Sequence, residues 1–434
     1  DKMSTPTTRV AFHTMGCQTN FSETSTISRE MMAHGLQQVS FRDKADVYVL
    51  NSCSVTENAD KEARKLIRQA RRRNPNAAVA VIGCYAQLHP AEIAAIPGVE
   101  LVVGAMEKFN LFAHLSSLKA NGKATVIQSP IERVQSFQPS FSATERTRIY
   151  LKIQDGCNYN CSFCTIPLAR GRSRSDNIVN TMNIAQQIAD TDAREIVLTG
   201  VNIGDYGVDG NEDFFQLIQA LDNIDGIDRF RISSIEPNLL SDEIITFCAH
   251  SKKFVPHFHI PLQSGADPIL RRMKRRYDTA LYSSRIEQIN NLMPDCCIGV
   301  DVIVGFPGEG EEDFLTTRSF LDSLDISYLH VFTFSERENT VAASLDNQVP
   351  QEEKAYRSKP LHKLSDEKRY AFHDKFLTQA RPVLFERSVN GMSQGYTDNY
   401  IRVQVATDMN YENRLLEVTL TNNHGPYMDG LVTE

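Results

Sequence analysis

Apolar and polar residues follow two different periods in the first part of the chain. Three runs rich in β-branched residues, 10–17, 47–53 and 78–84, have the composition of buried strands. Between them, residues 24–35 and 57–73 repeat apolar positions at helical spacing. Strands that alternate with helices in this way predict a parallel, doubly wound α/β sheet.

The same alternation returns in the middle of the chain. The predicted strands there are 150–157, 195–202, 230–237, 257–265, 298–309 and 327–336, each followed by a helical pattern. Six strand–helix units are two short of a complete eight-stranded barrel. We therefore predict a partial (βα)6 barrel, with its active residues at the carboxyl ends of the strands.

The last part of the chain has a different pattern of apolar and polar residues. Short alternating runs at 383–388, 400–405, 415–420 and 429–434 are separated by Gly, Asn and Asp, which is typical of a small antiparallel β-barrel. A polar stretch before the central alternation has the composition of a linker. The predicted organisation is an α/β domain at 9–127, a linker at 128–145, a partial barrel at 146–378 and a small barrel at 379–434.

Composition and charge argue against several classes of protein. The 434 residues include 54 acidic and 46 basic ones, a net charge of −8, which argues against a protein that coats nucleic acid through bulk charge. No run of about 18 apolar residues predicts a membrane span, and the first ten residues lack the apolar segment of a signal peptide. We therefore expect a cytoplasmic protein. In that reducing compartment, nine cysteines indicate metal or redox chemistry rather than disulfides.

The strongest local motif is CNYNCSFC, which holds Cys157, Cys161 and Cys164 just after the first central strand. Three thiolates so close together can hold three irons of a 4Fe–4S cube and leave the fourth iron open to a ligand. The alternative is a structural zinc site, which requires a fourth Cys or His nearby. The next Cys or His after Cys164 is Cys248, so the iron–sulfur interpretation is favoured.

This motif, with Phe163 directly before its last cysteine, resembles the radical S-adenosylmethionine (SAM) superfamily. The resemblance implies that the open iron chelates SAM and that an electron from the cluster cleaves it to a 5′-deoxyadenosyl radical. Four segments at later strand ends, LTGVN, SSIEP, PLQSG and VIVGFPGE, match the places where that family binds the cofactor. The cofactor-binding residues implied in this way are Phe163, Thr199, Gly200, Asn202, Ser234, Glu236, Gln263, Ile303 and Gly305.

Each of the three early strands ends in a cysteine: Cys17, Cys53 and Cys84. Because the carboxyl ends of parallel strands share one edge of a sheet, these cysteines can lie together; singly, each is equally well a small buried residue. MGCQTN, NSCSVTENAD and GCYAQ resemble the methylthiotransferase family of radical SAM enzymes, and the resemblance covers the whole chain. It implies a second 4Fe–4S cluster on this trio and a carboxy-terminal TRAM domain.

The implied chemistry replaces a C–H bond by C–S–CH3. In the family, one SAM methylates a sulfur at the auxiliary cluster and another supplies the radical, so a low-potential electron donor such as flavodoxin or ferredoxin and a source of sulfur are expected partners. Sulfur attack on a sulfonium methyl needs no extra base, and we predict no catalytic residue beyond the cluster and cofactor sites. His257, His259 and His330 lie on apolar strands and are expected to be interior histidines.

Local charge indicates an RNA substrate. Residues 61–74 carry seven basic residues and one acidic residue, and further arginines follow the radical motif. Such clusters neutralise phosphates, although a solvated helix face has the same composition. The predicted RNA-binding residues are Lys65, Arg68, Arg71, Arg72, Arg73, Arg170, Arg172 and Arg174.

The family divides by substrate. The segments NSCSVTENADKEARKLIRQ, SSIEP and RRYD resemble the branch that modifies N6-threonylcarbamoyladenosine at tRNA position 37, in the anticodon stem-loop. MGCQTN and VFTFSERENTVAA depart from that branch, so N6-isopentenyladenosine at the same position and an aspartate of a ribosomal protein stay as alternatives. A zinc-stabilised RNA-binding protein without enzymatic activity is the third hypothesis.

Overall fold

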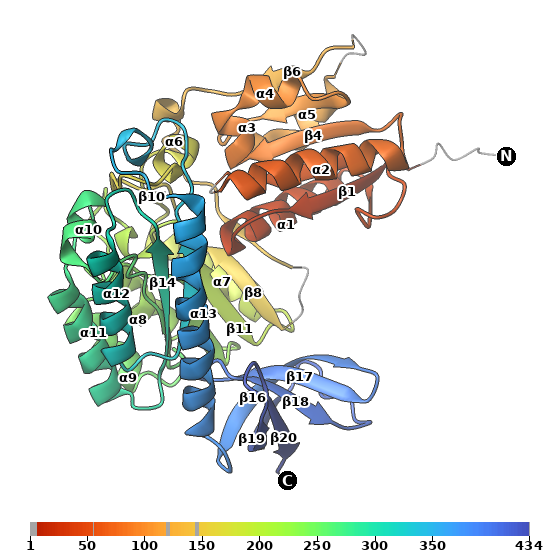
Figure 1. Cartoon of the computed structure of the whole chain (residues 1–434). Helices are drawn as coiled ribbons and strands as arrows, with labels where there is room; N and C mark the ends of the chain where they lie inside the picture. The colour runs from red at the N-terminus through yellow and green to blue at the C-terminus, as the bar shows by residue number, and fades with distance from the viewer. Residues whose placement is uncertain (1–6, 55, 119–121, 144–146, 434) are drawn as a thin grey trace.

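The protein is described here by a computed structural model covering residues 7–54, 56–118, 122–143 and 147–433. Some predicted parts therefore reach beyond the described residues. These positions are 1–6 of the chain start, 55 and 119–121 of the α/β domain, 144 and 145 of the linker, 146 of the partial barrel and 434 of the small barrel. In Figure 1, the first sheet lies at the upper right, a closed barrel lies at the lower right, and the larger central domain lies to their left. No helix in the described ranges is long and apolar enough to cross a membrane.

The first domain is a six-stranded parallel sheet. Its strands are β1 (Arg9–Thr14), β2 (Gln37–Val39), β3 (Val47–Ser52), β4 (Ala78–Gly83), β5 (Val99–Val103) and β6 (Thr125–Ile127), in the order β2-β1-β3-β4-β5-β6. One face packs on α1 (Gln18–Ala33) and α5 (Leu111–Ser116), and the other packs on α2 (Glu57–Arg73). The predicted doubly wound sheet is confirmed. Its strand order reverses between β1 and β3, which is where such folds bind ligands.

The central domain is the predicted partial barrel. Its parallel strands are β8 (Arg148–Lys152), β11 (Glu195–Thr199), β12 (Arg229–Ile232), β13 (His257–His259), β14 (Cys297–Val304) and β15 (Tyr328–Thr333). A bridge between Ser234 and His259 joins the two halves of this sheet. The covering helices are α7 (Ile178–Ala189), α8 (Phe214–Leu221), α9 (Asp242–His250), α11 (Thr279–Leu292), α12 (Glu311–Ser323) and α13 (Gln351–Asp374).

Side-chain alternation divides this barrel into an apolar outside and a polar inside. Phe258, Val300 and Leu329 belong to the core under the helices. Their neighbours in the strands, such as His257 and Asp301, therefore face inward. The polar concave side is where a substrate can be bound.

The last domain is a closed antiparallel barrel apart from one parallel pair. Its strands are β16 (Ala380–Val389), β17 (Met392–Thr397), β18 (Arg402–Ala406), β19 (Leu415–Asn423) and β20 (Met428–Val432). Arg229 of the central domain donates hydrogen bonds to the carbonyls of Tyr396 and Pro382, which fastens the barrel beneath β12. The predicted fold class is thus confirmed in all three parts.

Shorter elements connect these layers. They are α3 (Cys84–Leu88), α4 (Pro90–Ala94), β7 (Ser140–Phe141), β9 (Gln154–Asp155), α6 (Ile166–Arg170), β10 (Arg174–Ser175) and α10 (Asp267–Arg272), with single 3-10 turns at Glu107–Asn110, Ile131–Arg133, Ile203–Asp205 and Ala342–Ser344. Strand β7 lies inside the predicted linker and pairs antiparallel with β8, so that segment extends the central sheet.

Candidate functional site

The three early cysteines lie in a row at one edge of the first sheet. Cys17 directly precedes α1, Cys53 follows β3, and Cys84 begins α3 directly after β4. Because β1, β3 and β4 are adjacent strands, their carboxyl ends meet at the same edge. Gly16 has φ +86°, and a larger residue would not fit there, because its Cβ would lie 3.0 Å from the Cys53 Sγ. Burial raises the pKa of Cys84 and outweighs the lowering effect of Arg170 and Lys108, while the nearby Cys17 also raises it.

The three later cysteines lie on one loop after β9. The amide of Cys164 donates to the carbonyl of Cys161 at 3.2 Å, and the amide of Tyr159 donates to the Cys157 Sγ at 3.4 Å. Burial raises the pKa of Cys157 to about 11 and that of Cys164 to about 12. Ser162 fastens the loop, because its amide donates to the carbonyl of Met273 at 3.0 Å. The loop is therefore held in place by the protein itself.

Residues or elements next to each early cysteine contact the central domain near the loop that carries Cys157, Cys161 and Cys164. The Thr19 and Thr199 hydroxyls share a hydrogen bond of 3.1 Å, and the Thr165 hydroxyl donates to the carbonyl of Ser54 at 3.4 Å. Helix α3, which begins with Cys84, packs on α6, which follows Cys164. The segments that carry the two cysteine trios are therefore in contact at the junction of the first two domains.

Two of the predicted cofactor residues lie at the cysteine loop. The Asn202 amide nitrogen is 3.7 Å from the Cys157 Sγ, while its Oδ1 is buried and has no hydrogen-bond partner among the described residues. Glu236 forms an ion pair with Arg275, which donates to the Cys161 Sγ at 3.0 Å. A buried acceptor without a partner is costly unless a ligand satisfies it, so Asn202 marks a place for a bound group.

The other predicted cofactor residues are spread over the same ends of the strands. Gln263 has φ +71°, a strained conformation for a residue with a side chain, and its carbonyl accepts from the amide of Ile303 at 2.9 Å. Gly305 has no room for a Cβ, because Lys354 packs against it. Phe163 packs edge-on against Phe306, Gly200 lies against Gln154, Ser234 is exposed, and Thr199 bonds Thr19 as described above.

A buried cluster of charges joins the two domains beside the cysteines. The carboxylate of Glu23 accepts from Lys108 at 2.7 Å, from Lys152 at 2.9 Å and from Arg170 at 3.0 Å. Asp155 is the second carboxylate of the cluster and also contacts Arg170 at 3.0 Å. Burial alone would raise the pKa of Glu23, but the cations outweigh it and hold that pKa well below its usual value.

The predicted RNA-binding arginines after the radical motif need correction. Arg170 is buried in the charge cluster and therefore cannot reach a phosphate. Arg174 forms an ion pair with Asp155 at 3.3 Å and donates to two neighbouring carbonyls. Arg172 between them is exposed. The sequence places all three within five residues, and the structure separates them by burial.

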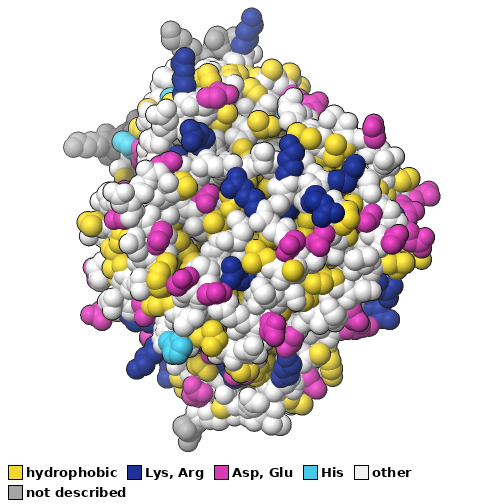
Figure 2. All heavy atoms as spheres, turned by 90° about the vertical axis from the view of Figure 1, so that its left-hand side faces the viewer, with side chains coloured by type: hydrophobic (Ala, Val, Ile, Leu, Met, Phe, Trp, Pro, Cys, Tyr) yellow, Lys and Arg dark blue, Asp and Glu magenta, His cyan; other side chains and the backbone are white. Residues whose placement is uncertain are grey.

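The predicted RNA-binding cations of helix α2 also fall into two groups, those that hydrogen bond to backbone carbonyls and those that are exposed without an ion-pair partner in the part of the chain that the structure describes. Arg71 donates to the carbonyl of Ala77, and Arg73 donates to the carbonyl of Phe41. Three others are exposed along one helix face and have no ion-pair partner among the described residues: Lys65, Arg68 and Arg72. Figure 2 shows further Lys and Arg side chains gathered above the middle of another face, the side on which α6 and α10 lie in Figure 1.

Several residues of the site could not be recognised from the sequence. Glu23 lies in an ordinary helical pattern, Asp155 precedes the cysteine motif without a signal of its own, and Arg275 is one of several arginines in a basic run. Arg337 is a fourth: it donates to the Ser54 hydroxyl at 2.8 Å and so holds the loop after Cys53. Only the fold brings these side chains to the cysteines.

Comparison with known proteins gives two matching families. Residues 9–104 match a family described as the uncharacterised protein family UPF0004, and residues 151–321 match the radical SAM superfamily. The chain is 38% identical to the threonylcarbamoyladenosine tRNA methylthiotransferase MtaB of Bacillus subtilis, over 97% of this chain and 95% of that protein. The corresponding MtaB of Aquifex aeolicus is 37% identical, over 91% of this chain and 96% of that protein.

Similarity extends to a second group of relatives, which are 28% to 35% identical to this chain. The tRNA-2-methylthio-N(6)-dimethylallyladenosine synthase of Hydrogenobaculum sp. is 28% identical, over 96% of this chain and 98% of that protein. Among solved structures, the radical SAM methyltransferase TsrM from Kitasatospora setae superposes with a TM-score of 0.56 at 13% identity, over 78% of this chain and 74% of that one. At that identity the likeness concerns the fold.

Proposed function

The chain belongs to the methylthiotransferase family of radical SAM enzymes, and we propose on that premise that it converts N6-threonylcarbamoyladenosine at tRNA position 37 to its 2-methylthio derivative. The relatives whose printed names specify threonylcarbamoyladenosine include the two that are 37% and 38% identical. A relative named for dimethylallyladenosine is 28% identical over a similar length. Another relative with the dimethylallyladenosine name is 35% identical, but over only 78% of this chain. The first substrate is supported by the two relatives that combine 37% and 38% identity with coverage above 90% of this chain.

Cys157, Cys161 and Cys164 would hold the 4Fe–4S cluster that the radical SAM family implies. When bound, this cluster supplies the electron that cleaves SAM and so creates a radical able to abstract hydrogen from an unactivated C–H bond. The surrounding side chains fit it: Arg275 donates to the Cys161 sulfur, and the Asn202 Oδ1 is a buried acceptor that a cofactor amino group could satisfy.

Cys17, Cys53 and Cys84 would hold a second cluster. When bound, that cluster would carry on its open iron the sulfur that becomes the methylthio group. The charge around this trio fits such a group. Three fully buried cations, Lys108, Lys152 and Arg170, face only two buried carboxylates. A cube held by thiolates adds negative charge and would balance the excess, which supports its assignment to this place.

The chain's own residues then orient the two sites. The Thr19–Thr199 hydrogen bond holds α1, which follows Cys17, against the end of β11, and the Thr165–Ser54 bond joins the residues that directly follow Cys164 and Cys53. The Glu23 charge cluster fills the space behind them and excludes water. Sulfur transfer requires that the substrate carbon meet both centres, and this arrangement is the single observation that supports the proposal most strongly.

The tRNA would be bound through its phosphates by the exposed cations Lys65, Arg68 and Arg72 of α2 and by Arg172. Single-stranded loop bases can be turned out of the stack and held by protein side chains, so position 37 can enter the concave side of the partial barrel. A low-potential electron donor such as flavodoxin or ferredoxin and a sulfur source would complete the reaction.

Nucleoside analysis tests the proposal directly. Anaerobically reconstituted protein is mixed with SAM, a chemical reductant and tRNA that carries either threonylcarbamoyladenosine or isopentenyladenosine, and the digested nucleosides are analysed by mass spectrometry. We expect the 2-methylthio derivative of threonylcarbamoyladenosine. Product from isopentenyladenosine alone, or methylthiolation of a ribosomal protein instead of tRNA, would contradict the substrate assignment.

A further inference from the structure

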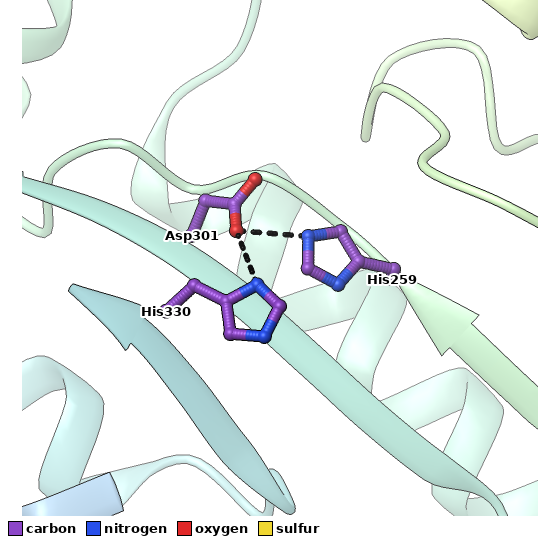
Figure 3. Close-up of side chains that lie close together, drawn as sticks. All are labelled: His259, Asp301 and His330. Carbon is purple, nitrogen blue, oxygen red and sulfur yellow. Dashed lines mark hydrogen bonds and ion pairs between the residues drawn. The ribbon is translucent and has the colours of Figure 1, made fainter. Parts of the chain in front are cut away.

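The concave side of the partial barrel carries a group of polar side chains that cysteine chemistry does not use. His259 on β13, Asp301 on β14 and His330 on β15 lie on three neighbouring strands, and Asp301 is paired in register with His330. Figure 3 shows both imidazole rings turned toward the same carboxylate. The residues therefore form one cluster on the inner face.

The geometry leaves one side of each imidazole open. The Asp301 Oδ1 lies 2.9 Å from the His259 Nε2 and 3.3 Å from the His330 Nδ1. No described residue pairs with the outer nitrogens, Nδ1 of His259 and Nε2 of His330. The His330 side chain is 50% exposed, so the expectation that it is an interior histidine is wrong. It lies on β15, which is the last strand of an incomplete barrel and has no partner on its outer edge among the described residues.

Beneath this cluster lies a second polar layer whose hydrogen bonds are made within the protein. Arg231 donates to Glu195 at 2.6 Å and contacts the His257 Nδ1 at 2.8 Å. Because a guanidinium can only donate, the His257 Nδ1 accepts, and its Nε2 donates to the Tyr328 hydroxyl at 3.0 Å. Burial and the Arg231 charge lower the pKa of His257, so this ring stays neutral. The inner surface is thus polar through two layers.

The cluster also lies directly next to the predicted cofactor residues. The carbonyl of Asp301 accepts from the amide of Gln263 at 2.9 Å, and Ile303 lies two residues further along β14, on the same face. Phe332 lies two residues beyond His330 on β15 and is 48% exposed. An exposed aromatic ring beside two imidazoles is a surface on which a base can stack.

We propose that His259, Asp301 and His330 bind the N6-substituent of the target adenosine and select substituents that carry hydrogen-bonding groups. This assignment rests on the proposed function and adds the residues that choose the substrate. A threonylcarbamoyl group offers a carboxylate, a hydroxyl and urea N–H groups, and imidazole nitrogens can donate to or accept from these. An isopentenyl group offers none of them and would leave the outer nitrogens of both imidazoles, Nδ1 of His259 and Nε2 of His330, desolvated and unpaired, which is the basis of strong discrimination.

A bound metal ion is the main competitor for this cluster. The three ligand atoms lie within 4.8 Å of one another, a separation that one ion can span. Histidines that ligate a metal usually donate their other N–H to a protein acceptor. Neither outer nitrogen has such an acceptor among the described residues, and both rings are already hydrogen bonded to Asp301. The arrangement therefore favours an organic ligand.

The test compares binding of three anticodon stem-loops that differ only at position 37: threonylcarbamoyladenosine, isopentenyladenosine and unmodified adenosine. Fluorescence anisotropy gives the affinity of reconstituted wild-type enzyme and of His330→Ala for each. We expect wild type to prefer the threonylcarbamoyl stem-loop, and His330→Ala to lose about tenfold in affinity for it while its affinity for unmodified RNA stays the same. His362→Ala, at an exposed histidine of α13, is the matched control and should bind like wild type.

Four results would overturn the inference. His330→Ala could bind all three stem-loops more weakly by the same factor, which would indicate a general RNA contact, or it could keep its preference. It could lose 5′-deoxyadenosine formation without RNA, which would make His330 a cofactor contact. Zinc could copurify with wild type but not with His330→Ala, and its removal by a chelator could abolish the preference. Loss of the preference alone leaves the proposed function intact, since that function is tested separately by the methylthiolated nucleoside from wild type.

Discussion

The two cysteine trios differ in how the chain brings them together. Cys157, Cys161 and Cys164 lie on one short loop, so their proximity is local and follows from sequence spacing. Cys17, Cys53 and Cys84 come from three strand ends, and only the order of β1, β3 and β4 makes them neighbours. The early trio therefore depends on the integrity of a whole sheet, whereas the later trio depends on one anchored loop.

Their surroundings differ as well. At the later trio, Arg275 donates to the Cys161 Sγ and is neutralised by an ion pair with Glu236. The early trio lies beside a buried cluster in which cations outnumber carboxylates and which spans two domains. Under the proposed function, radical generation would use the local loop of the later trio, and sulfur delivery would use the early trio beside a charge cluster that spans two domains.

A single substitution in the later trio distinguishes the roles of the two trios most clearly. Cys161→Ala should abolish 5′-deoxyadenosine formation, a loss of at least about a thousandfold, because two thiolates hold a cube poorly. Chromatographic assay of SAM cleavage under reducing conditions measures it. Cys248→Ala, at a buried cysteine of α9 outside both trios, should retain activity. Equal activity in the Cys161 and Cys248 variants would remove the later trio from the radical site.

The matching substitution in the early trio should separate the two half-reactions. Cys53→Ala should keep SAM cleavage within about threefold of wild type, because the later loop is self-contained, and should make no methylthiolated nucleoside. Both products are measured in the same reaction mixture. Methylthiolation at the wild-type level by Cys53→Ala would show that the early trio does not deliver sulfur.

The charge cluster predicts a large effect on stability rather than on chemistry. Glu23→Gln leaves Lys108, Lys152 and Arg170 with one fewer buried carboxylate and should cost about 3–5 kcal/mol in the free energy of unfolding. Denaturant unfolding of the cluster-free proteins measures the difference. Glu30→Gln, at an exposed position of the same helix, is the control and should change stability little. Equal stabilities of the two variants would contradict the role of Glu23.

The same residue predicts a pH dependence. The folded-state pKa of Glu23 lies well below 4.5, its ordinary value. A carboxyl group with a lowered pKa contributes stability that is complete above its unfolded-state pKa and is lost as the pH falls toward the folded-state value. The stability difference between wild type and Glu23→Gln should therefore be constant above about pH 5.5 and shrink in more acidic solution. A difference that grew with acidity would have the wrong sign.

The smallest expected effect concerns RNA. Replacing Lys65, Arg68 and Arg72 together by Ala should weaken tRNA binding by about tenfold to a hundredfold at low salt and reduce the slope of affinity against salt concentration by up to about three. Arg170→Gln should instead destabilise the fold, because Arg170 is buried.

Matched exposed cations of α12 and α13 provide the control for the RNA experiment. Replacement of Arg318, Lys359 and Lys363 removes the same charge from other helices. Equal loss of affinity in the two triple variants would mean that α2 contributes only general charge and not a binding face.

Much of the fold followed from the sequence, because strands and helices have strong periodic signals. All six central strands and three strands of the first sheet were predicted from apolar runs. Three strands of the first sheet were missed: β2 and β6, which have three residues each, and the five-residue β5 (VELVV). Strand β17 (MSQGYT) was missed because small and polar residues fill its inner positions. Gly395 allows β17 to approach β16 so closely that a Cβ would meet the Leu384 carbonyl.

The site was only partly predictable for a different reason. Cysteines at strand ends are visible in a sequence, but burial of a charge is not. Arg170 and Arg172 look alike in the sequence, but in the fold Arg170 is buried against Asn20 and Glu23 of α1, whereas Arg172 is exposed. His330 was expected inside because it lies on an apolar strand, but the barrel is incomplete and its last strand leaves this side chain half exposed.

The central claim, that two separate trios each hold a cluster, is tested most directly by counting iron. After anaerobic reconstitution, wild type should bind about eight irons per chain, and replacing either trio by Ala should leave about four. Mössbauer spectra should show 4Fe–4S clusters in all three proteins. A wild type that saturates at four irons, or an early-trio variant that still binds eight, would contradict the account.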